Sequence, residues 1–123
     1  MKSADVYSAD CPTRQILDRV GDKWAVLILL LLCDEPARFN GLRRAIDGIS
    51  QKMLSQVLKG LERDGLVHRR VFATVPVTVE YSITPLGKTL AKAVDPLREW
   101  AERNLKEVSA AQRRYDARKS AAA

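Results

Sequence analysis

The sequence predicts a mainly α-helical fold that contains one small β-hairpin. Three observations support this prediction. Up to residue 64, apolar residues recur at helical spacing in successive segments that are bounded by capping residues, proline or glycine. Between residues 66 and 83, the apolar spacing changes to two, as in β-strands. From residue 84 onward, helical spacing returns in one long segment.

The first two predicted helices lie close together in the sequence. The first follows Cys11, has Pro12 at its first helical position and ends at Gly21. The second follows Asp22, a predicted N-cap, and contains the segment WAVLILLLLC, which is apolar on every side. Because this helix has no polar face to turn towards water, we expect it to lie at the centre of the core.

A pair of helices separated by a tight turn comes next. A brief helix over residues 39–46 precedes a turn at Asp47 and Gly48, and Ser50 then caps a fourth helix that ends at Asp64. One face of the fourth helix is apolar and is expected to pack on the core; it consists of Met53, Leu54, Val57, Leu58 and Leu61. The opposite face is polar and consists of Lys52, Ser55, Gln56, Lys59 and Arg63.

The remaining elements are a hairpin and a long helix. Residues 66–72 and 78–83 are rich in β-branched and aromatic side chains, and the loop between them contains Pro76, so we expect an antiparallel hairpin. A long amphipathic helix begins at Pro85, with a kink expected near Pro96. Its apolar seam consists of Leu86, Leu90, Val94, Leu97, Ala101, Leu105 and Val108.

This order of three helices, a fourth two-faced helix and a hairpin is the winged helix-turn-helix arrangement. We therefore expect a flexible N-terminal segment over residues 1–10. A winged helix-turn-helix domain with additional N- and C-terminal dimerisation helices is expected over residues 11–109. Residues 110–123 are basic and rich in alanine without a clear apolar stripe, and they are expected to form a disordered tail.

The amino-acid composition limits the kinds of partner and the cellular location that we expect for this chain. The 21 Lys and Arg residues exceed the 15 Asp and Glu residues, and a net charge of +6 attracts a polyanion or an acidic membrane surface. The longest apolar run, Trp24 to Cys33, is much shorter than the about 20 residues that a membrane-spanning helix needs. The first ten residues lack the apolar stretch of a secretory signal. We therefore predict a cytoplasmic protein that does not associate with membranes.

Residues with catalytic or metal-binding chemistry are sparse. Two cysteines and one histidine do not form a zinc pattern, and the dispersed glycines do not form a phosphate-binding loop. His68 lies next to Arg69 and Arg70 on a predicted strand and is interpreted as structural or as a phosphate donor. We predict that the chain is not an enzyme and binds no metal or cofactor.

The polar face of the fourth helix predicts binding to double-stranded DNA. An α-helix fits the major groove, where Lys donates to guanine or to phosphates and Gln pairs with adenine. A solvated surface helix is the alternative, but this face has no acidic residue before Glu62, a tight turn precedes it and an arginine-bearing hairpin follows it. The predicted DNA-binding residues are Arg43, Arg44, Ser50, Gln51, Lys52, Ser55, Gln56, Lys59, Arg69 and Arg70.

The chain closely resembles the HxlR family of winged-helix transcriptional regulators, which are relatives of the MarR-type repressors. The segments that carry this resemblance are CPTRQILDRVGDKWAVLIL, RFNGLRRAIDGISQKMLSQVLKGLERDGLVHRR and VPVTVEYSITPLGKTL. The resemblance implies a homodimer that presents two recognition helices, here residues 50–63, to a palindromic operator. It assigns residues 66–83 to the wing. Thr78 stands where many family members have a basic residue, so charge from the wing is expected from Arg69 or Arg70, of which at most one faces DNA.

The same resemblance implies that the first and last helices form the dimer. The seam of the last helix exposes more apolar surface than a chain of this length normally leaves in water. Packing of that seam on the chain's own first helix is the alternative, and we expect the half before Pro96 to pack inward. The predicted dimerisation residues are Ile16, Leu17, Leu97, Trp100 and Leu105.

Cys11 is a candidate sensor of a small electrophile or oxidant. It lies at the start of a helix, where unpaired backbone N–H groups favour a negative charge. Several HxlR-type regulators are similar in having a cysteine before proline at this place, and some use it to detect electrophiles or peroxides. The alternative is a small residue that caps the helix. Cys33 is expected to be buried and inert.

The leading hypothesis is therefore a sequence-specific, dimeric, DNA-binding transcriptional regulator. The alternative is a winged-helix protein-interaction module without DNA binding, because a scaffold does not determine its function. Such a module would normally have lost the basic charge of Lys52 and Lys59.

Overall fold

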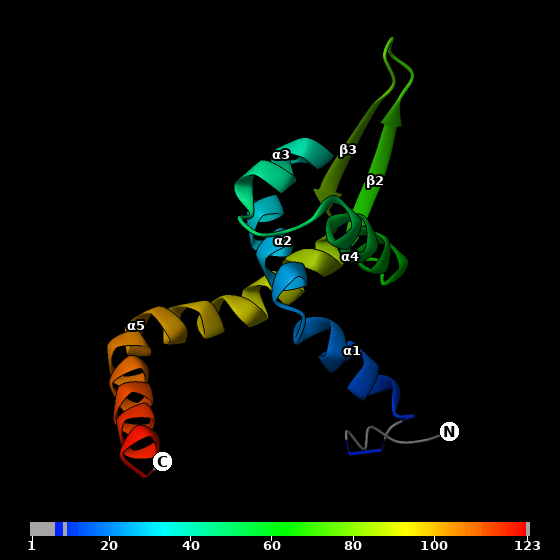
Figure 1. Cartoon of the computed structure of the whole chain (residues 1–123). Helices are drawn as coiled ribbons and strands as arrows, with labels where there is room; N and C mark the ends of the chain where they lie inside the picture. The colour runs from blue at the N-terminus through cyan, green and yellow to red at the C-terminus, as the bar shows by residue number, and fades with distance from the viewer. Residues whose placement is uncertain (1–6, 9, 123) are drawn as a thin grey trace. The chain divides into compact units, whose positions relative to one another are not determined.

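The computed structural model describes residues 7–8 and 10–122 of the chain. The chain forms two compact units, one that ends at Ala93 and one that begins at Val94. In chain order the elements are α1 (Pro12–Val20), α2 (Lys23–Asp34), β1 (Ala37–Arg38), α3 (Phe39–Ala45), α4 (Gln51–Arg63), β2 (Val67–Phe72), β3 (Thr78–Ile83) and α5 (Pro85–Ala122). Figure 1 labels all of them except β1.

The core of the first unit is built around α2 and α4. The all-round apolar sequence of α2 buries Ala25, Ile28, Leu29 and Leu32, as its pattern predicted. Helix α4 buries one face on this core, and that face consists of Leu54, Val57, Leu58 and Leu61. The predicted apolar face was therefore correct apart from Met53, which is 40% exposed.

The hairpin prediction is confirmed. Strands β2 and β3 are antiparallel, with Val67 opposite Ile83 at one end and Phe72 opposite Thr78 at the other. Val67 is buried at the base of the hairpin, and Tyr81 and Ile83 of β3 pack against the core cluster. Figure 1 shows that the hairpin extends from this base beyond α3 and α4.

A third, two-residue strand was not predicted. Strand β1 pairs with β3 so that Ala37 lies opposite Tyr81 and Arg38 lies opposite Glu80. The sheet order is therefore β1-β3-β2. Two residues are too few to show the alternation by which a strand is recognised in a sequence.

Local signals fix the ends of the helices. The Asp22 carboxylate accepts a hydrogen bond from the backbone N–H of Trp24 at 2.9 Å, which confirms the predicted N-cap of α2. Between α3 and α4, Gly48 has φ +86, a conformation that residues with a side chain rarely adopt. The Trp24 ring lies beside Gly48, and the buried Ile46 and Ile49 flank it. The turn is thus fixed by one glycine and by its apolar neighbours.

The C-terminal segment differs from the prediction of a disordered tail over residues 110–123. Helix α5 extends to Ala122, so residues 110–122 are helical. Alanine, arginine, glutamine and lysine are strong helix formers, and intrinsic propensity therefore produces a helix where no apolar stripe is visible. The boundary between the two units also lies before Pro96 rather than at residue 109. Residues 1–6 and 9 of the predicted N-terminal segment lie outside the described residues.

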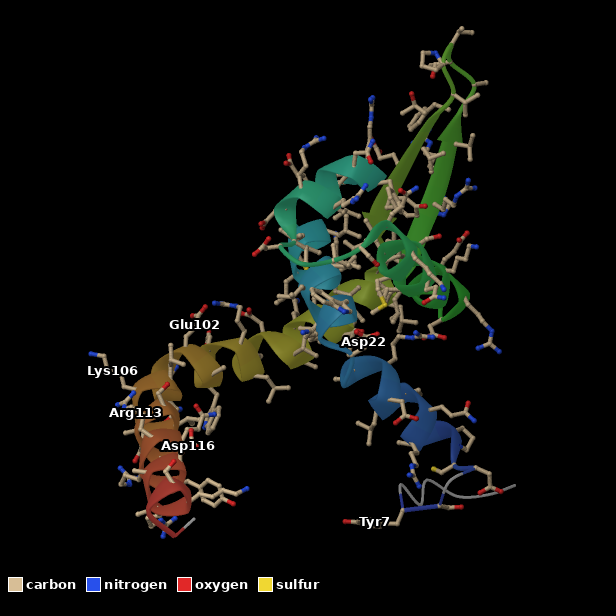
Figure 2. All side chains as sticks on the ribbon, in the orientation of Figure 1. Tyr7, Asp22, Glu102, Lys106, Arg113 and Asp116 are labelled. Atoms are coloured by element: carbon tan, nitrogen blue, oxygen red, sulfur yellow. The ribbon has the colours of Figure 1, made fainter. Side chains whose placement is uncertain are left out.

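The second unit is a segment of α5 with its own ion pairs. Arg98 donates to Asp95 and to Glu102, each at 2.9 Å. These contacts raise the pKa of Arg98 above its usual value, mainly through the hydrogen bond to Asp95. Figure 2 shows Glu102, Lys106 and Arg113 projecting from the surface of this helix. Such i,i+3 and i,i+4 pairs stabilise an exposed helix modestly.

No helix in the described part of the chain combines the length and the apolar character that crossing a bilayer requires.

The packing of α4 leads to a stability prediction. Leu54 is 0% exposed, so Leu54→Ala should lower the free energy of unfolding by about 2–5 kcal/mol. Met53→Ala is the matched control, because this neighbouring side chain is 40% exposed and its loss should cost no more than about 0.5 kcal/mol. Urea denaturation followed by circular dichroism measures both values. Equal losses in the two variants would contradict this description of the core.

Candidate nucleic-acid interface

The face of α4 opposite the core is exposed and polar. Gln51, Lys52, Gln56 and Lys59 are all exposed, and Ser55 is half-buried. Lys52, Gln56 and Lys59 follow one another at intervals of four and three residues, so they share one side of the helix. Their position is dictated by the buried leucines and Val57 on the other side.

Lys52 and Lys59 give this surface a positive charge that no neighbouring acid in the described part of the chain neutralises. No carboxylate within the described residues forms an ion pair with Lys52 or Lys59. The first turn of α4 contains no acidic residue. The N-terminal end of a helix also has a partial positive charge, so this end of α4 is suited to an anion such as a phosphate.

Ser50 has a structural role that its sequence position predicted. Its backbone is extended, and its hydroxyl oxygen accepts a hydrogen bond from the backbone N–H of Met53 at 3.1 Å. The cap fixes the point where α4 begins. Because Ser50 is exposed as well, it lies at the edge of the surface that Gln51 and Lys52 begin.

The two predicted arginines of α3 are also exposed. Arg43 and Arg44 follow Leu42, which is 1% exposed and anchors α3 in the core. Both arginines lie in the last turn of α3, where a positive charge complements the helix dipole.

The wing places Arg69 and Arg70 on opposite faces of the sheet. Arg69 lies opposite Tyr81, whereas Arg70 lies opposite Glu80 and its guanidinium is 4.8 Å from the centre of the Phe72 ring. Both side chains are exposed. The alternation is consistent with the expectation that at most one of the two arginines faces a single ligand.

One arginine near this surface was missed by the sequence prediction. Arg38 of β1 is exposed and lies opposite Glu80, which in turn lies opposite Arg70. The three residues therefore form a row across the sheet with one acid between two bases. Only the pairing of β1 with β3 reveals this row, since Arg38 and Glu80 are far apart in the sequence.

The wing tip is apolar rather than charged. Val75 and Val77 are 102% and 65% exposed, and the Thr74 hydroxyl donates to the Pro76 carbonyl at 2.7 Å. Thr74 and Thr78 also share a hydrogen bond across the loop. The tip thus has no basic side chain at Thr78, the position at which many members of the resembled family have one.

The two cysteines differ from each other, and one prediction was wrong. Cys11 is the N-cap residue of α1, is 1% exposed, and does not cap the helix through its side chain. Its backbone N–H donates to the carbonyl of Ser8 at 3.1 Å. Cys33 was expected to be buried but is exposed. It lies in the last turn of α2, where the helix leaves the core even though the apolar run continues to this residue.

The predicted dimerisation residues are exposed. Helix α1 has no buried residue, and its Ile16 and Leu17 are 62% and 51% exposed. A cavity of about 640 Å³ opens beside α1 in the first unit, with walls that include Ile16, Leu86 and Leu90. In the second unit, exposed apolar side chains continue the seam of α5, and these are Leu97, Trp100, Leu105 and Val108.

Comparison with known proteins identifies the family. The model of the HxlR-like helix-turn-helix family matches residues 19–109, well over half of the chain. The chain belongs to the HxlR-like helix-turn-helix family. Within it, α3 and α4 are the helix-turn-helix pair and β2 and β3 are the wing of a winged helix-turn-helix fold. The family is one of transcriptional regulators, as the sequence resemblance predicted.

Individual relatives agree with this assignment. The chain is 44% identical over 110 residues to a protein of Escherichia coli K12 named as the HTH-type transcriptional regulator YtfH, covering 89% of this chain and 87% of YtfH. The solved structure of the YtfH regulator from Salmonella typhimurium has a TM-score of 0.84 and 42% identity, covering 90% of this chain and 99% of that one. The redox regulator HypR in its reduced form has a TM-score of 0.74 and 40% identity, covering 80% and 98%.

Proposed function

We propose that this HxlR-like chain is a sequence-specific DNA-binding regulator that acts as a homodimer on a palindromic operator. The observation that carries the proposal is the exposed polar face of α4 opposite a fully buried apolar face. A helix anchored in this way can enter a major groove without uncovering its own core. The membership in a family of transcriptional regulators supports the same conclusion.

The exposed residues suit distinct tasks on DNA. Lys52 and Lys59 would neutralise phosphates or donate to guanine, Gln51 and Gln56 would pair with adenine, and Ser55 would bond to either base. Ser50 and the N-terminal end of α4 would approach a phosphate. The remaining predicted contacts, from α3 and the wing, would lie along the backbone and are Arg43, Arg44, Arg69 and Arg70.

The proposal of a homodimer is based on apolar side chains that are exposed in the isolated chain. Ile16 and Leu17 of α1 and Leu97, Trp100 and Leu105 of α5 are each more than half exposed in the isolated chain. A second copy of the chain is the occupant that would cover both helices at once, because a two-fold dimer brings the same surfaces together twice. Two recognition helices would then lie about 34–36 Å apart, one turn of DNA.

Cys11 is proposed as a thiol sensor. HypR, a relative at 40% identity, is a redox regulator with structures in a reduced and an oxidised form. Peroxide would convert the Cys11 thiol to a sulfenic acid with release of water, and an electrophile such as a quinone would add to the sulfur. Cys11 is only 1% exposed, so a group added to its sulfur would press on the residues that bury it. We propose that modification displaces the start of α1 in this way.

The relatives named here belong to a non-enzymatic class, and we propose that this chain is likewise not an enzyme and acts in the cytoplasm. A protein-interaction module without DNA binding is the competing function. The unpaired basic charge of Lys52 and Lys59 favours DNA, and the first experiment below separates the two functions.

Binding to DNA should depend steeply on salt and on the two lysines. Fragments selected from the source genome provide the operator, and fluorescence anisotropy at several salt concentrations gives the slope of log K against log salt. Each phosphate contact contributes about −0.9 to that slope, so Lys52→Ala and Lys59→Ala should each reduce its magnitude by about 0.9 and weaken binding about tenfold at 0.1 M salt. Lys106→Ala, a change on the second unit, is the control.

A slope near zero, or a slope that the double variant Lys52→Ala/Lys59→Ala leaves unchanged, would contradict DNA binding through α4. A wild-type chain that retains no fragment in the selection would favour the protein-interaction module.

The dimer should depend on the exposed seam of α5. Trp100→Glu places a charge where an apolar contact is proposed and should raise the dimer dissociation constant at least about thirtyfold, as for other interface hot spots. Analytical ultracentrifugation measures this constant. Val77→Glu is the matched control, because Val77 is similarly exposed but lies at the wing tip. A wild-type monomer at micromolar concentration, or equal effects of both changes, would contradict the proposed interface.

The response to oxidants should reside in Cys11. Peroxide or benzoquinone should change the DNA affinity of the wild type, while Cys11→Ser should show no change because it lacks the thiol. Cys33→Ser controls for the second, exposed thiol and should respond like the wild type. Anisotropy measures the affinity, and intact-protein mass spectrometry records the modification. Sensing is rejected if wild-type binding ignores both reagents or if Cys11→Ser still responds.

A further inference from the structure

A side chain of α1 lies directly on the backbone of α4. A Cβ atom added to Gly60 would lie 2.6 Å from the Arg19 Cζ atom and 2.7 Å from its Nη2 atom. These distances are shorter than real Cβ contacts, so the guanidinium of Arg19 occupies the space that any side chain at position 60 would need. Glycine is a poor residue for a helix interior, and here its missing side chain admits the arginine.

The guanidinium of Arg19 also forms an ion pair with a carboxylate of α4. Arg19 Nε donates to Asp64 Oδ2 at 2.6 Å, and Asp64 is the C-cap residue of α4. Both side chains are about two-thirds or more shielded from solvent, since they are 28% and 31% exposed. The guanidinium therefore rests on one turn of α4 and pairs with the residue that ends the helix.

This contact is distinctive within the described part of the chain. Among the ion pairs between described residues, the Arg19–Asp64 pair alone connects different elements, while the others lie within α5. Helix α1 has no buried residue of its own. Arg19 is thus the polar connection between α1 and the C-terminal half of the helix that bears Lys52 and Lys59.

We propose that Arg19 is a positioning residue that sets the orientation of α4 for reading DNA through its contacts with Gly60 and Asp64. The inference rests on the proposed function. Arg19 need not touch DNA to act in this way, because its guanidinium lies on Gly60 and bonds to Asp64, and so connects α1 with the C-terminal turn of α4. Arg19 lies near the C-terminal end of the nine-residue α1, and Cys11 lies just before its first residue. A displacement of α1 at either end would therefore alter the angle at which α4 meets the groove.

Gly60→Ala offers a direct test. The atoms that an alanine Cβ would meet are the far end of a flexible side chain, so the change should displace the guanidinium without preventing folding. We expect Gly60→Ala, Arg19→Ala and Asp64→Ala each to weaken binding to the selected operator about fivefold or more. The double variant Arg19→Ala/Gly60→Ala should bind no more weakly than Arg19→Ala alone, because the contact can be lost only once.

Three further measurements distinguish positioning from loss of charge or loss of stability. Arg14→Ala removes a charge from the same helix, away from Gly60, and should bind like the wild type. In the Arg19→Ala background, Gly60→Ala should raise the melting temperature, since alanine favours the helix, yet should not restore affinity. Binding to unrelated DNA should stay unchanged in Gly60→Ala, because this change alters no charge.

The outcomes separate this inference from the proposed function. A wild type that binds its operator while Arg19→Ala and Gly60→Ala bind equally well would overturn the positioning role alone, as would effects that simply add in the double variant. A wild type that binds no DNA would overturn the proposed function and the positioning role with it. Weakened operator binding in all three single variants, with unchanged binding of Gly60→Ala to unrelated DNA, would support the role of Arg19.

Discussion

The burial of α4 on α2 is the constraint on which the rest of the molecule depends. Helix α2 is apolar on all sides and must be shielded from water. Helix α4 packs against it with its buried face, which consists of Leu54, Val57, Leu58 and Leu61. Burying these side chains contributes about 1.5–3 kcal/mol each, so the rotation of α4 about its own axis is strongly determined. Its polar face has no freedom to turn inward. The exposed polar surface of α4 is therefore a consequence of how the core packs.

The turn before α4 fixes the place at which the helix begins. Ile46 and Ile49 are buried on either side of Gly48, whose positive φ reverses the chain within a few residues. The Ser50 cap then begins the helix immediately. A side chain at Gly48 would be strained, while the flanking isoleucines hold the turn against the core. The N-terminal end of α4 therefore reaches the surface at a defined place.

Periodic segments were predictable from sequence, whereas contacts between distant residues were not. The buried face of α4 and the pairing of β2 with β3 follow from spacings of 3.6 and two residues. The two-residue β1 and the exposure of Cys33 follow from where neighbouring elements end, which no local pattern records. The helical residues 110–122 lack a stripe, and the prediction gave too little weight to their propensity. The contact between Arg19 and Gly60 joins residues far apart in the sequence, so no local pattern predicts it.

Helix α1 is the element that the core explains least. It buries no side chain within its nine residues, and a helix of that length is marginal in water by itself. Its place comes from its contacts with α2 and from its two ends. Cys11 is buried at one end and Arg19 is seated on Gly60 at the other, while Ile16 and Leu17 between them are exposed. If α1 moves on modification of the thiol or on dimerisation, as proposed, the contact of Arg19 with Gly60 and Asp64 is the connection through which that movement would reach α4.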